Sequence, residues 1–284
     1  MTVWRAWDAD DDEYAEALVI REMLPLPMRA AANSWLRTCL ESAYGHTDES
    51  SVNAIQSALR VDLGLDTGRV DTEQLVESIE RHGDRVIVRV IDFCLSDFSP
   101  TDGYHRMPPV VESLKWHFDQ NMSSVCVQLD GDCYRIARRL PAGVEELAQE
   151  AVATANEVAG RHLSKGWSEA QSLTPDTSAV MTEAIRAVEA AAGAVVTPND
   201  RRPRMGKIVG ALRDNTDWTL VLATRDDGHP DQRIILIGMI EALVFAEQHR
   251  HSGADPSALE ALTHIQLAST LVAWFSMGSV TKLK

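Results

Sequence analysis

The sequence predicts a mainly α-helical protein with two helical domains, of which the N-terminal one carries a small β-hairpin. Apolar residues recur at helical spacing through most of the chain. Alternating segments at Val125–Leu129 and Cys133–Ile136 flank Asp130-Gly131, which is a strong hairpin signal. The second half is rich in alanine, and small residues favour the close helix packing of a bundle. A chain of 284 residues is long enough for two domains.

Helical periodicity predicts most of the N-terminal elements. In the second predicted helix, for example, Ala32, Trp35 and Leu36 fall on one face. The run Val86–Phe93 is rich in β-branched residues, so helix and strand both remain open. The loop Ser96–Pro109 is punctuated by proline and glycine. We expect helices at Tyr14–Leu24, Met28–Tyr44, Val52–Leu63, Thr72–His82 and Val110–Met122.

The chain begins with Trp4 and Trp7, followed by a run of acidic residues. Carboxylates are favoured at the positive end of a helix dipole, so the simplest interpretation of the run is the start of a helix. A protein-interaction patch is the alternative. The seven tryptophans of the chain are interpreted as residues of the core or of an interdomain contact.

One long helix, Val144–Ser168, is expected to connect the domains. The prediction therefore divides the chain into an N-terminal helical domain (1–143), a connecting helix (144–173) and a C-terminal helical bundle (174–284). The bundle begins with the alanine-rich segment Thr177–Val195. A shorter amphipathic helix is expected at Ile208–Asp214.

Charge and cysteine content limit the possible partners and compartments. The formal net charge is −15, from 42 acidic and 27 basic residues, so any nucleic-acid site must be a small local patch. The four cysteines form no CxxC motif and no Cys/His ligand set, which is typical of reduced thiols in a cytoplasmic protein. No apolar run reaches the roughly 20 residues of a membrane span, so no membrane partner is expected.

Motifs of the large enzyme classes do not occur. The sequence has no P-loop, Rossmann glycine fingerprint, HExxH, GxSxG or EF-hand loop. Carboxylates and histidines do not occur together at the sequence spacing that is typical of metal ligands. We therefore expect no metal and no cofactor.

The polar stretch His249-Arg250-His251-Ser252-Gly253 concentrates the most chemistry. It is expected to form an elbow between two apolar helices. Gly253 suits a left-handed helix end, and Asp255-Pro256 suits an N-cap followed by proline at the first helical position. Side chains of both helices could therefore converge on the histidines and the arginine.

A second candidate site is the basic patch, defined as Arg201, Arg202, Arg204 and Lys207. These four cations precede or open the expected helix at Ile208–Asp214. Free N–H groups at a helix start bind phosphate, so the patch is the candidate RNA-binding surface. A solvated surface turn is the alternative interpretation.

The order of segments in the last third resembles bacterial abortive-infection-type proteins. The segments that carry the resemblance are Ala184–Ala190 (AIRAVEA), Met205–Val209 (MGKIV) and Arg250–Gly253 (RHSG), followed by an apolar final helix. The resemblance covers roughly Thr174–Phe275 and implies a C-terminal domain of the HEPN-like helical class. Active members of that class are metal-independent RNases of phage defence and toxin systems, so it also implies a defence effector that binds or cleaves RNA.

Metal-free RNA cleavage requires an acid, a base and positive charge at the phosphorus. His251 and His249 are the candidate acid/base groups because histidine titrates near neutral pH. Arg250 is the candidate charge stabiliser. A homodimer would bring two such elbows together. Active relatives separate the Arg and the His by a spacer, whereas Arg250 and His251 are adjacent.

Two alternatives to catalysis remain open at the sequence level. Arg250 and His251 are also suited to capping the preceding helix, where its dipole favours cations. The whole chain could equally be a catalytically inactive helical interaction or sensor module, carried by a phage or mobile element.

Overall fold

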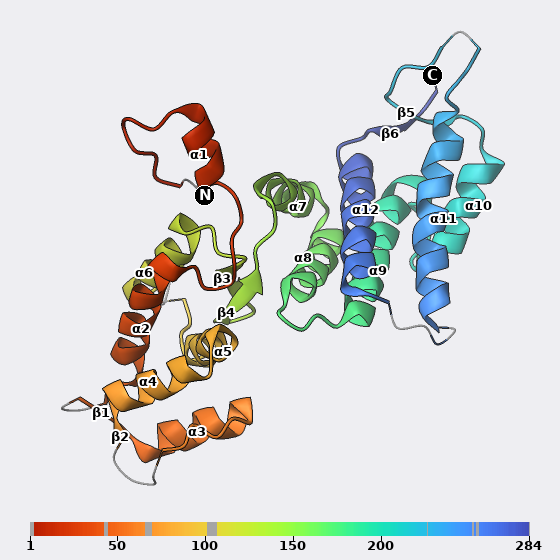
Figure 1. Ribbon diagram of the computed structural model, residues 1–284. Coiled ribbons are helices and arrows are strands. Elements are labelled where there is room, and N and C mark those ends of the chain that lie inside the picture. Colours follow the sequence, from red (N-terminus) through yellow and green to blue (C-terminus); the bar gives the residue numbers. More distant parts are fainter. Residues whose placement is uncertain are drawn as a thin grey trace. The chain divides into compact units, whose positions relative to one another are not determined.

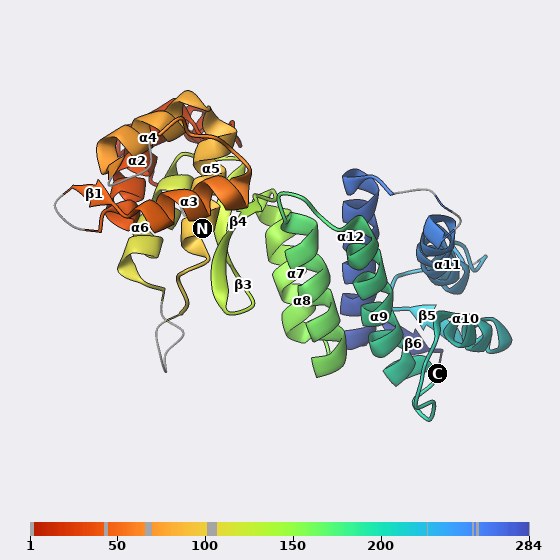
Figure 2. The ribbon, with the colours of Figure 1, turned by 90° about the horizontal axis from the view of Figure 1, so that it is seen from below.

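A computed structural model describes residues 3–42, 45–65, 70–100, 107–225, 227–251, 253 and 256–283, without the side chains of residues 250 and 251. The described residues are mainly helical, with small antiparallel sheets of two strands each (Figures 1 and 2). The mainly helical prediction is therefore confirmed. The chain divides into two compact units, Met1–Leu140 and Pro141–Lys284.

The first unit begins with a short helix and ends with a hairpin. Its elements are α1 (Asp11–Ala17), α2 (Leu26–Leu40), β1 (His46–Thr47), α3 (Glu49–Leu59), β2 (Val70–Asp71), α4 (Thr72–Arg81), α5 (Asp84–Leu95), α6 (Pro109–Gln120), β3 (Val125–Asp130) and β4 (Cys133–Arg138). Helix α2 contacts α4, α5 and α6, and the hairpin contacts α5 and α6. The core of the unit lies between these helices, where Met28, Leu36 and Phe118 are fully buried.

The hairpin prediction is confirmed, with Asp130 pairing with Cys133 across the turn. Gly131 has a φ of 61°, a conformation that favours glycine. Cys126 lies opposite Ala137, so the two thiols of the hairpin are not cross-strand partners. The carboxylate of Asp92 on α5 anchors the second strand. It accepts hydrogen bonds from both the guanidinium and the backbone of this strand, at Arg135 Nη2 (2.6 Å) and Ile136 N (2.7 Å).

The ambiguous run Val86–Phe93 is helical and lies within α5. Its residues Ile87, Val88 and Ile91 are fully buried. Tertiary packing of this apolar face outweighs the strand preference of β-branched residues. The first helix is shorter than predicted: α1 ends at Ala17, and none of its residues is buried.

The second unit contains the remaining elements. They are α7 (Ala142–Thr154), α8 (Glu157–Gln171), α9 (Thr177–Val196), α10 (Met205–Asp214), β5 (Trp218–Leu220), α11 (Gln232–His251), α12 (Ala258–Ser276) and β6 (Val280–Lys282). Helices α7, α8, α9 and α12 pack side by side, and α10 and α11 pack on each other and against α9 (Figures 1 and 2). The strands β5 and β6 pair antiparallel, which joins the C-terminal end of the unit to the segment before α11.

The prediction of one connecting helix at Val144–Ser168 is wrong. The chain leaves the helical conformation at Ala155, and the Asn156 side chain caps a new helix by accepting a hydrogen bond from Ala159 N–H (2.9 Å). A Cβ atom at Gly160 would lie only 3.0 Å from the Val152 carbonyl, so glycine allows α8 to start close to α7. Both helices pack within the second unit, where α7 contacts α12 and α8 contacts α9.

The prediction of a single hairpin is also incomplete. The pairs β1–β2 and β5–β6 are strands of two or three residues, which is too short for an alternating pattern to be recognisable in the sequence. No helix in the described part of the chain is long and apolar enough to cross a membrane.

Candidate functional sites

The predicted elbow is largely helical. Helix α11 continues through His249, Arg250 and His251, so these residues form its last turn and not a loop. The side chain of His249 is exposed, and its ring centroid lies 6.2 Å from that of Phe245, one turn earlier. The side chains of Arg250 and His251 lie outside the described residues. The backbone placement puts all three at the C-terminal end of a helix dipole, which favours cations.

The start of the following helix also differs from the prediction. Helix α12 is capped by Ser257, whose hydroxyl accepts a hydrogen bond from Glu260 N–H (3.1 Å). Asp255, the predicted cap, lies outside the described residues. Gly253 has a φ of 101°, consistent with the predicted left-handed helix end.

The basic patch is partly neutralised by carboxylates of its own unit. Lys207 forms an ion pair with Asp200 (2.7 Å), and Arg204 forms one with Glu189 (3.4 Å). The Lys207 ammonium, together with the Arg202 backbone N–H, lowers the pKa of Asp200. Arg201 and Arg202 are exposed in the preceding bend.

The N-terminus of α10 is also occupied. Glu189 on α9 accepts a hydrogen bond from Met205 N–H (3.0 Å), the first residue of α10. A carboxylate of the protein therefore takes the place that a phosphate would need at this helix start. The geometry favours a structural role for the patch, in which α9 is linked to α10.

A cluster that the sequence did not reveal surrounds Glu183 on α9. This residue is 4% exposed, and its carboxylate accepts hydrogen bonds from His162 Nδ1 (2.6 Å), Lys165 Nζ (3.0 Å) and Arg186 Nη1 (3.1 Å). Burial raises the pKa of Glu183, but the hydrogen bonds from His162 and Lys165 outweigh this effect and lower it overall. The cluster satisfies a buried charge and joins α8 to α9.

Three tryptophans of the first unit are exposed, so the interpretation that they belong to the core is wrong for them. The exposed fractions are 71% for Trp4, 94% for Trp7 and 55% for Trp116. We call these three residues the tryptophan surface. In contrast, Trp35, Trp167 and Trp218 are buried as predicted. The core interpretation fails at Trp4 and Trp7 because their segment contributes almost nothing to the core: only Val3 is buried among residues 3–20.

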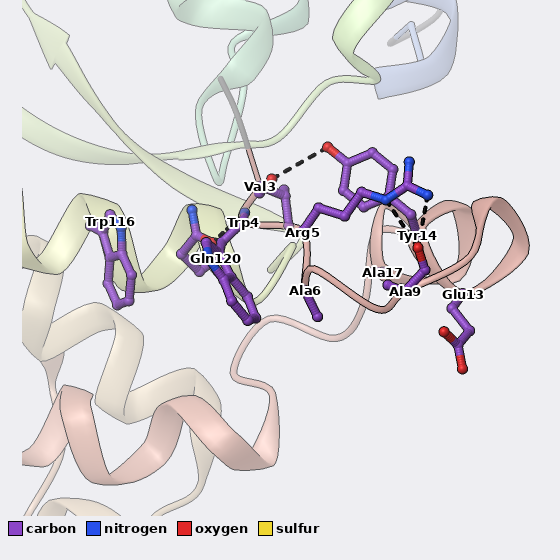
Figure 3. Close-up of a pocket in the computed structure, with 10 residues that line it drawn as sticks. All are labelled: Val3, Trp4, Arg5, Ala6, Ala9, Glu13, Tyr14, Ala17, Trp116 and Gln120. Atoms are coloured by element: carbon purple, nitrogen blue, oxygen red, sulfur yellow. Dashed lines mark hydrogen bonds between the residues drawn. The ribbon is translucent and has the colours of Figure 1, made fainter.

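A cavity of about 450 Å³ lies at the tryptophan surface (Figure 3). Trp4 and Trp116 line it together with Arg5, Tyr14 and other residues of the N-terminal segment and α6. The backbone N–H of Trp4 donates to Gln120 Oε1 on α6 (2.8 Å), which fixes the segment beside this helix.

The same cavity holds a cation of the chain itself. The Arg5 guanidinium lies 5.1 Å from the centre of the Tyr14 ring and donates to Ala9 O (2.8 Å) and Asp11 Oδ1 (2.9 Å). The Tyr14 hydroxyl donates to Val3 O (3.3 Å). These contacts order the segment that carries the exposed tryptophans.

A second cavity, of about 400 Å³, lies in the C-terminal unit. It is lined by α7, α8 and α12, with Trp167, Trp274 and Leu147 among its apolar residues. The Trp167 Nε1–H donates to Ser269 Oγ (2.9 Å), so the buried polar atoms at its base pair with each other. Within the described ranges, no group of three or more His, Cys, Asp or Glu side chains is placed to hold a metal ion.

No family model, no curated protein and no solved structure matches the chain. The resemblance to abortive-infection-type proteins therefore stays a prediction.

Proposed function

We propose that the chain is a helical interaction protein whose first unit binds a protein partner through the tryptophan surface. The observation that carries the proposal is the exposure of Trp4 and Trp7 on an N-terminal segment ordered by hydrogen bonds, together with the exposure of Trp116 on α6. Large exposed apolar side chains are typical of interaction sites when they form a patch, and Trp4 and Trp116 line one cavity. Tryptophan is also among the residues that contribute most to binding energy.

The size of the indole makes its burial energetically important. A tryptophan buries on the order of 150–250 Å² when it is covered. At about 25 cal/mol per Å² of apolar area, covering the exposed parts of the three indoles corresponds to roughly 10 kcal/mol before the costs of association are subtracted. The same unit also exposes the apolar residues Leu18, Val19, Ile20 and Leu26, which follow α1 or begin α2.

The charge of the segment defines the partner. Residues 3–20 contain six carboxylates and a single cation, Arg5. All six carboxylates are exposed, and they belong to Asp8, Asp10, Asp11, Asp12, Glu13 and Glu16. Complementary charge directs encounters between proteins and excludes partners of like charge. The partner is therefore a protein segment that combines basic with apolar residues.

A fluorescent nonapeptide that alternates lysine with leucine is expected to bind the full-length protein. We expect Trp4→Ala combined with Trp7→Ala to weaken binding at least about tenfold, because loss of two hot-spot residues costs more than about 1.4 kcal/mol. Fluorescence anisotropy measures the affinity. Added salt should weaken binding, since exposed charges are screened.

Two controls accompany this titration. Phe245→Ala removes an aromatic side chain that is 69% exposed on α11 in the other unit, and it should leave the affinity unchanged. A glutamate/leucine peptide should not bind. Equal affinity of the wild type and the double variant, or equal binding of both peptides, would contradict the proposed surface.

The second candidate function is the abortive-infection-type effector that binds or cleaves RNA as a homodimer. It is favoured by the exposed His249 imidazole in the same helical turn as Arg250 and His251. Arg201, Arg202, Arg204 and Lys207 would bind the phosphates. The pairing of Lys207 and Arg204 with carboxylates is the reason that this candidate stands second.

The two candidates differ in their effect on RNA. In EDTA, purified protein is expected to leave total RNA and tRNA intact, because the partly neutralised patch provides little free positive charge for the phosphates. Gel electrophoresis of wild type, Arg250→Ala and His251→Ala decides between them. Cleavage by the wild type that both variants lose would establish the second candidate and place the site at the end of α11.

A further inference from the structure

The tryptophan surface contains one position with a distinct chemistry, the half-open cavity that Trp4 and Trp116 help to line. Trp116 and Gln120 are four residues apart on α6, so they lie on one face of the helix, about one turn apart. The hydrogen bond from the backbone N–H of Trp4 to Gln120 Oε1 therefore holds the backbone of Trp4 close to the Gln120 end of this face. Figure 3 shows the two indoles in this arrangement, with Gln120 beside Trp4.

The two indoles leave room for a group from outside. Among the described residues, Trp4 and Trp116 make no ring contact with each other. Trp116 contacts the ring of its neighbour His117 edge to face, at 4.9 Å between centroids. The cavity of about 450 Å³ that both indoles line falls within the usual range for a bound side chain or small ligand.

The cavity already holds one guanidinium, that of Arg5. This group occupies the face of Tyr14, and its donors are committed to Ala9 and Asp11. Arg5 is therefore held at Tyr14, and no ring contact of Arg5 with Trp4 or Trp116 is present among the described residues. Indole is the aromatic ring with the strongest attraction for a cation, and the indoles of Trp4 and Trp116 remain 71% and 55% exposed.

We infer that the cavity lined by Trp4 and Trp116 binds an arginine side chain of the partner. The inference rests on the proposed function, since it names the group that the tryptophan surface recognises. A guanidinium is planar, is more weakly hydrated than an ammonium and stacks on aromatic faces, which suits a space bordered by two indoles. The exposed carboxylates of the neighbouring segment, Glu13 among them, complement its charge.

The test varies one residue of the probe. Lysine/leucine nonapeptides are synthesised with arginine, lysine or citrulline at the central position, where citrulline keeps the shape of arginine but is neutral. We expect the arginine peptide to bind the wild type about 3- to 30-fold more tightly than the citrulline peptide, the range of a partly desolvated cation–π contact. The lysine peptide should lie between them.

The matched variant is Trp116→Leu, which keeps an apolar side chain but removes the indole face. In this variant, the ratio of the affinities for the arginine and citrulline peptides should fall. The remaining ratio should reflect only the attraction between the guanidinium and exposed carboxylates. A ratio in Trp116→Leu equal to that of the wild type would overturn the inference. Circular dichroism of the variant verifies that the fold is kept.

The outcomes separate the inference from the proposed function. If the arginine and citrulline peptides bind the wild type equally, and both still lose affinity in the Trp4/Trp7 double variant, the inference fails and the proposed function stands. If no peptide binds the wild type at concentrations up to about 1 mM, the inference and the proposed function both fail. A dissociation constant of about 1 mM corresponds to a binding free energy near −4 kcal/mol.

Discussion

Replacement of Arg139 by alanine is expected to destabilise the protein by about 3–5 kcal/mol, the usual cost of breaking a buried ion pair. The Arg139 side chain is 3% exposed and pairs with Asp119 on α6 (2.8 Å). It also donates hydrogen bonds to three backbone carbonyls, those of Ser123 (2.6 Å), Phe118 (3.1 Å) and Val125 (3.3 Å). Truncation therefore leaves Lys115 as the only ion-pair partner of the buried Asp119 carboxylate among the described residues, and it removes one hydrogen bond from each of the three carbonyls.

Urea denaturation followed by circular dichroism measures the loss, and hydrogen exchange locates it. Exchange should accelerate in α6 and in the hairpin β3–β4, the elements that Arg139 joins. The control is Lys115→Ala, which removes the other partner of Asp119. Lys115 is 38% exposed, so its loss should cost no more than about 1 kcal/mol. Equal destabilisation by the two variants would refute the assigned role of Arg139.

Glu183→Ala is expected to destabilise the second unit by about 2 kcal/mol, because three charge-assisted hydrogen bonds to a buried carboxylate are lost. The cost is smaller than for Arg139 because Lys165 and Arg186 are 69% and 52% exposed and regain water. Thermal unfolding of the full chain measures the effect. Unchanged stability would show that the cluster contributes nothing to the packing of α8 on α9.

The same variant should change the response to acid. The pKa of Glu183 is lower in the folded protein than its ordinary value near 4.3, despite the opposing effect of burial. The stabilisation by its ionised form is therefore fully present above about pH 5 and is lost as the pH falls through the folded pKa. Glu183→Ala should lose less stability than the wild type between about pH 5 and pH 3. Glu150→Gln, at an exposed position on α7, should behave as the wild type.

Much of the helical framework could be predicted because single elements obey local rules. The helix Thr72–Arg81 starts and ends within a residue of the prediction, since Asp71 caps it by accepting from Glu73 N–H and Gln74 N–H. The hairpin follows from its alternation and its Asp-Gly turn. The break at Asn156 carried a local signal, an N-cap residue, but the continuous apolar stripe around it favoured one helix.

The candidate sites were harder to predict because their partners are distant in sequence. Nothing in the neighbourhood of His162 indicates Glu183, which lies on the next helix. The neutralisation of Lys207 by Asp200 could have been suspected from their spacing, whereas that of Arg204 by Glu189 depends on the packing of α9 against α10. Tryptophan composition alone cannot distinguish Trp35 in the core from Trp7, which is 94% exposed.

The most direct test of the central claim is the titration of the lysine/leucine peptide against wild type and the Trp4/Trp7 double variant. We predict saturable binding by the wild type, weakened at least about tenfold in the double variant and unaffected by Phe245→Ala. Equal affinities of all three proteins would contradict the claim that the tryptophan surface recognises a basic partner.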